Sequence, residues 1–197
     1  MTRIIAGTAR GRRLKVPDGR TTRPTSDRAR EGLFSTLVSL LGGMEGVRLL
    51  DLYAGSGAVG LEALSRGAAA ALLVEADRTV SRAVRENLDA LGLPGGRLLQ
   101  DRAERVAAAP CPDEPYDAAF LDPPYALAAP ELAAVVGALA ANGWLADGAV
   151  VAIERASRAE PWSWPAGFAP IRSRGYGEGT VWYGRRRAVL AGDGLPI

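Results

Sequence analysis

Two stretches of the sequence combine acidic residues with backbone features that could do chemistry. The first runs from Asp51 to Gly60, where the glycines are spaced G-x-G-x-x-G directly after an apolar run. Glycines at that spacing let the chain turn sharply into a helix and approach a ligand closely. Glu75 ends the next apolar run, where an acid can accept hydrogen bonds from both ribose hydroxyls. The pattern predicts a nucleotide site, although a tight turn that binds nothing would use the same glycines.

The position of Asp51 indicates which nucleotide would bind. A dinucleotide site places pyrophosphate at the start of the helix, where a nearby carboxylate would repel it. Asp51 stands four residues before Gly55, at the expected end of the strand. An acid there suits a ligand that carries positive charge and no phosphate. S-adenosylmethionine, with its sulfonium and ammonium groups, fits this description better than NAD or ATP.

The second stretch is Asp122-Pro123-Pro124-Tyr125, which follows another apolar run. Two prolines remove two backbone N–H donors and stiffen the turn, so that carbonyl oxygens remain available as acceptors. Asp122 and these carbonyls could hold an exocyclic amine while Tyr125 stacks on the ring that carries it. A rigid turn would give the same tetrapeptide. Its place about 70 residues after the glycine loop favours the catalytic interpretation.

The composition removes several other chemistries. The chain has no histidine, which excludes Ser-His-Asp and Cys-His catalysis and the usual zinc sites. Cys111 is the only cysteine, so no disulfide can form within the chain and we expect no metal site. At 197 residues and 48% hydrophobic content, the chain can form a core without such links. Any catalysis must rest on carboxylates, tyrosines, backbone dipoles or a cofactor.

Apolar periodicity predicts an α/β fold. Strands are expected at 47–53, 71–75, 98–99, 117–122 and 149–153, and helices at about 26–41, 58–67, 80–91 and 130–139. Alternation of this kind indicates a mostly parallel sheet with helices on both faces. Residues 171–174 and 180–183 predict a C-terminal antiparallel hairpin. Residues 1–23, with basic and apolar residues between glycines, predict a small β-hairpin extension to a catalytic domain over 24–197.

Charge is distributed unevenly along the chain. Residues 1–30 contain nine basic and two acidic side chains, a net +7, and the remaining 167 residues carry 15 basic and 20 acidic groups, a net −5. A basic segment on a mildly acidic body predicts a polyanionic partner. A solvated surface in an arginine-rich chain is the alternative. The basic residues expected to contact nucleic acid are Arg3, Arg10, Arg12, Arg13, Lys15, Arg20 and Arg23.

These motifs together resemble a family of class I S-adenosylmethionine-dependent methyltransferases, with a Rossmann-like, seven-stranded fold. The glycine loop and Asp122-Pro-Pro-Tyr125 match its D-x-x-x-G-x-G and [DNS]-P-P-[YFW] motifs. Within that class the chain resembles the RsmD family, which methylates guanine N2 in bacterial 16S ribosomal RNA. The resemblance is carried by residues 23–34, R-P-T-S-D-R-A-R-E-G-L-F, and by a looser match of residues 3–14.

The resemblance implies roles for particular residues. Ala54, Gly55, Ser56 and Gly57 would line the methionine part of S-adenosylmethionine above Asp51, and Glu75 would bind its ribose. Asp101 would accept from the adenine amine, with Arg102 adjacent, although an acid there could equally cap a helix. Thr25 and Arg23 would contact the methionine end or the target nucleotide. The target amine would be held by Asp122, Pro123, Pro124 and Tyr125.

The implied substrate is 16S ribosomal RNA in an assembling small subunit, and we expect a cytoplasmic monomer without a membrane segment. Three alternatives remain open. The same motifs serve amino-methyltransferases that act on DNA adenine or cytosine, or on protein glutamine. A nicotinamide-dependent oxidoreductase fits the glycines but is opposed by Asp51. A non-catalytic RNA-binding protein is opposed by the intact Asp122 and Tyr125.

Overall fold

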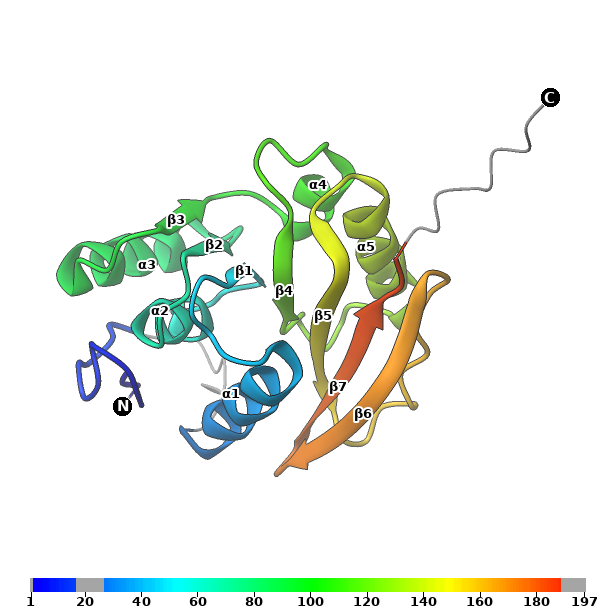
Figure 1. Ribbon diagram of the computed structural model, residues 1–197, viewed down its shortest axis with the longest axis horizontal. Coiled ribbons are helices and arrows are strands. Elements are labelled where there is room, and N and C mark those ends of the chain that lie inside the picture. Colours follow the sequence, from blue (N-terminus) through cyan, green and yellow to red (C-terminus); the bar gives the residue numbers. More distant parts are fainter. Residues whose placement is uncertain (1, 17–26, 189–197) are drawn as a thin grey trace.

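The computed structural model describes residues 2–16 and 27–188 (Figure 1). A seven-stranded sheet forms its centre, in the order β3-β2-β1-β4-β5-β7-β6. The strands are β1 Arg48–Leu52, β2 Ala70–Val74, β3 Gly96–Leu99, β4 Tyr116–Leu121, β5 Leu145–Ala156, β6 Phe168–Tyr176 and β7 Gly179–Arg186. The first five strands are parallel, and β7 pairs antiparallel with both β5 and β6. The predicted mostly parallel sheet with a C-terminal hairpin is confirmed.

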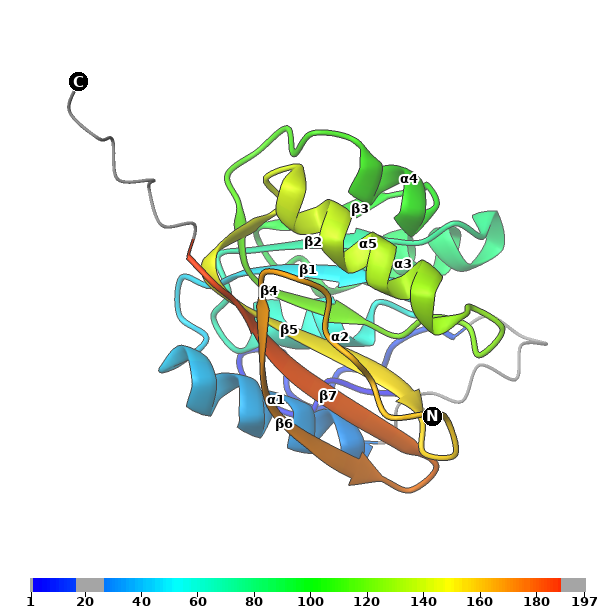
Figure 2. The same cartoon turned by 90° about the vertical axis from the view of Figure 1, so that its right-hand side faces the viewer.

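Helices cover both faces of the sheet (Figures 1 and 2). They are α1 Asp27–Leu41, α2 Ala58–Ser65, α3 Arg78–Leu91, α4 Ala103–Ala108 and α5 Ala129–Ala141. The side chains of α4 and α5 pack with one face of the sheet, and those of α1, α2 and α3 with the other. No helix among the described residues is both long and apolar enough to cross a bilayer.

The predicted C-terminal ends of α1 at residue 41 and of α3 at residue 91 are confirmed, whereas α2 ends two residues before the predicted residue 67. α1 ends before Gly42, whose φ of 80° is the left-handed conformation that favours glycine, and α3 ends at Gly92 with a φ of 61°. Asp77 begins α3 by accepting hydrogen bonds from the amides of Thr79 and Val80. The predicted start of α1, at about residue 26, lies outside the described residues.

Two elements differ from the prediction. Helix α4 was not expected, because its six residues are too few to show a clear apolar period. Strand β5 extends well beyond the predicted residues 149–153, since β7 pairs with it as far as Ala156. Residues 154–156 at the end of β5 therefore pair with β7 of the hairpin, beyond the last residue that pairs with β4.

Residues 2–16 pack against the body of the protein. The only regular β-bridge in this described segment joins Arg3 and Arg13, and turns at Gly7 and Gly11 separate the two arms, so the predicted hairpin is reduced to a short pairing. The side chains of Ile4, Ala9 and Leu14 are buried in a cluster formed with α2, α3 and β2. The basic side chains between them face solvent.

Buried polar side chains of α2 and α3 hold this segment in place. The Glu62 carboxylate is fully buried and accepts from the amides of Ile5 (2.7 Å) and Ala6 (2.9 Å) and from Arg66 Nε (2.8 Å). Ser65 Oγ accepts from the Ala9 amide at 2.9 Å and donates to the Ala6 carbonyl at 2.6 Å. Backbone groups of the segment are thereby satisfied by the body.

Replacing Glu62 with alanine should lower the free energy of unfolding by about 2 to 3 kcal/mol, because it leaves buried donors without an acceptor. Chemical denaturation measures this loss, and limited proteolysis should cut within residues 2–16 at lower protease concentration. The exposed Glu160→Ala variant is the matched control. A loss in Glu62→Ala below about 0.5 kcal/mol, the usual range for surface substitutions, would show that the anchor contributes little.

Candidate active site

Parallel pairing brings the carboxyl ends of the central strands into one row. Val74 of β2 is paired with Leu52 of β1, Leu52 with Leu121 of β4, and Leu121 with Ile153 of β5. The acids Glu75, Asp122 and Glu154 each follow directly after a residue of this row. Side chains at equivalent positions of paired strands leave the same face of a sheet.

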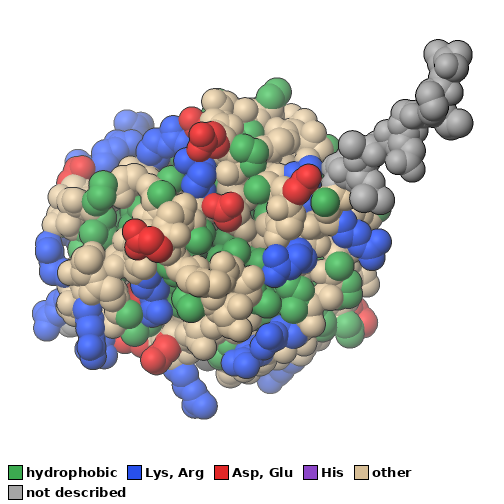
Figure 3. Space-filling view, in the orientation of Figure 1, with side chains coloured by type: hydrophobic (Ala, Val, Ile, Leu, Met, Phe, Trp, Pro, Cys, Tyr) green, Lys and Arg blue, Asp and Glu red, His purple; other side chains and the backbone are tan. Residues whose placement is uncertain are grey.

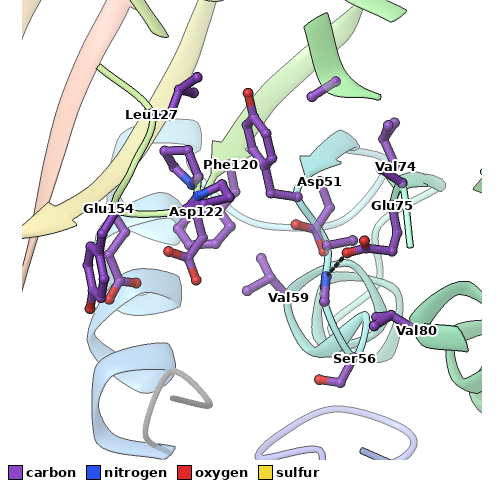
Figure 4. Close-up of a pocket in the computed structure, with 18 of the residues that line it drawn as sticks. Asp51, Ser56, Val59, Val74, Glu75, Val80, Phe120, Asp122, Leu127 and Glu154 are labelled. Carbon is purple, nitrogen blue, oxygen red and sulfur yellow. Dashed lines mark hydrogen bonds between the residues drawn. The ribbon is translucent and has the colours of Figure 1, made fainter. Parts of the chain in front are cut away.

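Asp51 lies on that same face, because it is paired with Phe120 of β4, whose side chain packs towards α1 and α2. Figure 4 shows the resulting arrangement, with Asp51 and Glu75 on one side of a pocket and Asp122 and Glu154 on the other. The row therefore gathers negative charge from four strands at a single edge.

A cavity of about 1050 Å³ opens at this edge. Its described lining contains eleven of the residues predicted for cofactor and target binding: Asp51, Ala54, Gly55, Ser56, Glu75, Asp101, Arg102, Asp122, Pro123, Pro124 and Tyr125. Gly57 is not part of that lining, and Thr25 lies outside the described residues. One cavity thus joins the two stretches that the sequence singled out.

The three glycines of the loop have different surroundings. A Cβ at Gly57 would lie 2.7 Å from Leu73 Cδ2, and one at Gly60 would lie 2.9 Å from Leu73 Cγ, so both glycines allow α2 to pack closely on β2. A Cβ at Gly55 would meet only the Tyr53 carbonyl oxygen, at 4.0 Å. The expectation that the loop approaches a ligand therefore applies to Gly55, which faces the cavity, while Gly57 and Gly60 serve packing.

Carboxylates hold the glycine loop in shape. Glu75 accepts from the amide of Gly55 at 3.0 Å, drawn in Figure 4, and from the amide of Asp77 at 2.8 Å. Asp51 is 1% exposed and accepts from the amide of Gly60 at 2.8 Å. Burial is the main cause that raises the pKa of Asp51 well above its ordinary value, and the charges of Asp122 and Glu75 raise it further.

The turn after β1 and the start of α4 also line the cavity. Tyr53 has a φ of 60°, rare for a non-glycine residue, and its hydroxyl donates to Glu104 Oε1 at 2.9 Å. Asp101 accepts from the amide of Arg102 at 2.8 Å and lies 3.6 Å from Arg105 Nη1. Asp101 thus has a local role at the start of α4 and lines the cavity as well.

The Asp122-Pro-Pro-Tyr125 turn is held by contacts that leave particular acceptors available. The Leu127 amide donates to the Pro124 carbonyl at 2.9 Å, and Arg155 Nη1 donates to the Leu127 carbonyl at 2.9 Å. Within the described chain no backbone N–H donates to the Pro123 carbonyl. Tyr125 is 70% exposed and is part of the cavity lining. Burial, followed by the charge of Glu154, raises the pKa of Asp122 to about 7.

Comparison with known proteins identifies the family. The family model described as "Conserved hypothetical protein 95" matches residues 2–185. Ribosomal RNA small subunit methyltransferase D of Escherichia coli (strain K12) is 43% identical over 152 residues, 77% of this chain and 73% of that protein. The chain belongs to the ribosomal RNA small subunit methyltransferase D family.

Solved structures share the fold of this methyltransferase D family member. The Escherichia coli putative methyltransferase yhhF is 39% identical, with a TM-score of 0.81 over 95% of this chain and 98% of its own. A hypothetical protein of Thermus thermophilus is 34% identical, with a TM-score of 0.74 over 93% of this chain and 98% of its own. The Rossmann-like methyltransferase fold predicted from the motifs is confirmed.

The basic residues of this methyltransferase D family member lie on the outside of residues 2–16. Arg3, Arg10, Arg12, Arg13 and Lys15 are all exposed, whereas Arg20 and Arg23 lie outside the described residues. Lys15 pairs with Glu86 of α3 at 2.9 Å, and Arg3 pairs with Asp27 at 3.1 Å. In Figure 3 basic side chains line the left margin, over α3 and the N-terminal segment, with another group over β6 and β7.

Asn87 connects that basic segment to the glycine loop. Its Oδ1 accepts from the Lys15 amide at 2.7 Å, and its Nδ2 donates to the Lys15 carbonyl at 3.0 Å and to the Ser56 carbonyl at 3.1 Å. The side chain is 2% exposed. Displacing residues 2–16 would therefore remove partners from the residue that supports Ser56.

Sequence reasoning missed several residues that line the cavity, chiefly Glu154, Tyr176, Tyr53 and Val80. Glu154 had a usable signal, because it follows an apolar strand as Glu75 and Asp122 do. Tyr176 lies at the end of β6, far along the chain from both motifs, and reaches the site only through the hairpin's packing. In the described part of the chain, no three side chains of metal-binding type come together.

The pKa of Asp122 predicts a pH effect on stability. An acid whose pKa is higher in the folded than in the unfolded chain binds more protons when folded, so it lowers stability as pH rises between the two values. The free energy of unfolding should therefore fall, relative to Asp122→Asn, by on the order of 3 kcal/mol between about pH 4 and pH 7. Denaturant titrations of both proteins across this range provide the measurement. Parallel curves would contradict the raised pKa.

Proposed function

We propose that this protein transfers a methyl group from S-adenosylmethionine to the exocyclic N2 amine of a guanine in 16S ribosomal RNA of the assembling small subunit. The observation that carries the proposal is the cavity that joins the Asp51–Gly57 loop to the Asp122-Pro-Pro-Tyr125 turn. Relatives named as small subunit ribosomal RNA methyltransferases support the substrate class.

The cofactor side of the cavity has the donor set that S-adenosylmethionine needs. Asp51 and Glu75 supply negative charge, and their hydrogen bonds go to loop amides that a phosphate ligand would otherwise use. A sulfonium and an ammonium are stabilised by such charge, while a pyrophosphate is repelled. Bound there, S-adenosylmethionine supplies an electrophilic methyl group. Glu75, which accepts from two backbone amides, would bind the ribose, and Asp101 would accept from the adenine amine.

The target side of the cavity suits an aromatic amine. The nitrogen's lone pair is delocalised into the ring, so the amine reacts only when hydrogen bonds favour a pyramidal nitrogen. Asp122 and the Pro123 carbonyl supply two acceptors for its hydrogens, and Tyr125 presents a ring on which the base can stack. As the N–C bond forms, the nitrogen becomes acidic. Asp122, with a pKa of about 7, can then take the released proton.

The basic segment gives the polyanion a surface next to the site. Arg10, Arg12 and Arg13 are exposed on residues 2–16, and that segment is bonded through Asn87 to the glycine loop. Contacts from these side chains to phosphates would supply affinity that does not depend on base sequence. The base itself would have to leave its stack to reach Asp122.

The test is methyl transfer from radiolabelled S-adenosylmethionine to small subunits from a strain that lacks this protein, followed by nucleoside analysis. The wild type should give N2-methylguanosine at one site. Asp122→Ala should lower the rate by at least about 100-fold and still bind the cofactor, because it removes an acceptor used at the reacting amine. Glu160→Ala, far from the site in sequence and exposed, should match the wild type.

Label in another nucleoside, in DNA or in protein would replace this proposal with one of the other amino-methyltransferases. Cofactor binding without any label in ribosomal RNA would refute the substrate assignment. Full activity in Asp122→Ala would refute the role of that carboxylate.

Phosphate contacts from the N-terminal segment predict a salt effect. Arg10→Ala combined with Arg13→Ala should weaken RNA binding and reduce the slope of log affinity against log salt concentration by about 2, roughly one for each lost phosphate contact. Filter binding at several salt concentrations measures the slope. The matched double replacement of Arg158 and Arg172, both exposed, tests whether charge alone is responsible. Equal slopes for the two double variants would contradict a specific role for the segment.

A further inference from the structure

Glu154 stands beside Asp122 on the target side of the cavity. Leu121 and Ile153 are paired across β4 and β5, and each is followed by one of the two acids. Neighbouring strands lie about 4.8 Å apart, so the two side chains leave the same face of the sheet as direct neighbours. Both line the cavity, and Figure 4 shows them together on the wall opposite Asp51 and Glu75.

The hairpin leaves room for the Glu154 carboxylate. A Cβ at Gly179 would lie 2.5 Å from Glu154 Oε1, so any larger residue at the start of β7 would push the carboxylate out of its place. Gly179 is buried, and it also lines the cavity together with Tyr176. The β6–β7 turn therefore forms one wall of the space in which the carboxylate lies.

Two adjacent carboxylates repel one another when both are ionised, and the charge of Glu154, after burial, raises the pKa of Asp122. A ligand that donates hydrogen bonds to both would reduce this repulsion. Carboxylates accept hydrogen bonds and donate none when ionised, so the pair selects for two donors side by side.

Among the bases with an exocyclic amine, guanine alone presents that pattern. Its pairing edge places the N1–H donor next to the N2 amine. Adenine places the N1 lone pair next to its N6 amine, and cytosine places the N3 lone pair next to its N4 amine. A carboxylate that faces either lone pair would be repelled by it, and both groups would remain without a hydrogen-bond partner. Leaving buried polar groups unpaired discriminates strongly against the wrong base.

We propose that Glu154 accepts a hydrogen bond from N1–H of the target guanine and thereby selects guanine over adenine and cytosine. This inference rests on the proposed function, since it assigns a residue to the base that the enzyme methylates. Asp122 holds the reacting amine, and Glu154 reads the neighbouring ring position. Specificity for guanine then comes from the hairpin side of β5, outside both sequence motifs.

The decisive substrate contains 2-aminopurine in place of the methylated guanine, in small-subunit RNA assembled from synthetic fragments. This base keeps the amine that receives the methyl group and replaces N1–H with a lone pair. The wild type should prefer guanine in kcat/KM by about 10- to 100-fold or more, because a hydrogen bond to a charged group is lost. In Glu154→Gln the amide can donate to that lone pair, so the preference should fall to within about threefold of unity.

Glu178→Gln is the matched control. It removes one charge from an exposed residue of the β6–β7 turn, and Glu178 also lines the cavity. Its preference for guanine should equal that of the wild type. Cofactor binding by Glu154→Gln establishes that the variant is folded. If that variant proves unstable, the wild type alone still decides, since equal kcat/KM on guanine and 2-aminopurine would overturn the inference.

The same experiment separates this inference from the proposed function. N2-methylguanosine formation together with an unchanged preference in Glu154→Gln would reject the role of Glu154 and leave the methyltransferase activity standing. No methylation of guanine in ribosomal RNA by the wild type would reject both. A preference that falls in Glu154→Gln and persists in Glu178→Gln supports the assignment.

Discussion

The parallel register of β2, β1, β4 and β5 is the constraint on which the site depends. Pairing Val74, Leu52, Leu121 and Ile153 in one row makes the residues that follow them neighbours at one edge of the sheet. A shift of one residue in any strand would turn its acid to the opposite face. The fully buried side chains of this row fix the register, since any shift would expose them. The chemistry of the edge is thus set by core packing beneath it.

Gathering carboxylates in one cavity costs electrostatic free energy. In the proposed function, this cost determines which ligands the cavity accepts. Burial and mutual repulsion raise the pKa values of Asp51 and Asp122. The cost is offset when positive charge enters one half of the cavity and N–H donors enter the other. The N-terminal segment adds a basic outer surface, and Asn87 links its backbone to the loop at Ser56. In the proposed function, RNA binding and cofactor binding would therefore share structural supports.

Local sequence patterns predicted most of the helices and strands. Contacts that depend on how the strands pair could not be predicted from the sequence. Glycine stops and apolar periods located most helices and strands, and the acids of both motifs lie in one cavity as expected. Glu154 has no spacing motif around it, so only the pairing of β4 with β5 shows it beside Asp122. Nothing in the sequence indicated that a Cβ at Gly57 would collide with the side chain of Leu73. Glu62 and Asn87 resemble ordinary helix surface residues until the folded N-terminal segment buries them.

Calorimetric titration of the protein with S-adenosylmethionine and with NAD measures which ligand charge this edge of the sheet accepts. We expect one site for S-adenosylmethionine and none for NAD. Binding of S-adenosylmethionine should be weaker in Asp51→Asn, which keeps an oxygen for the Gly60 amide and replaces the charged carboxylate with a neutral amide. Binding of NAD at the same site, or an Asp51→Asn affinity equal to that of the wild type, would contradict the proposed charge preference of the site.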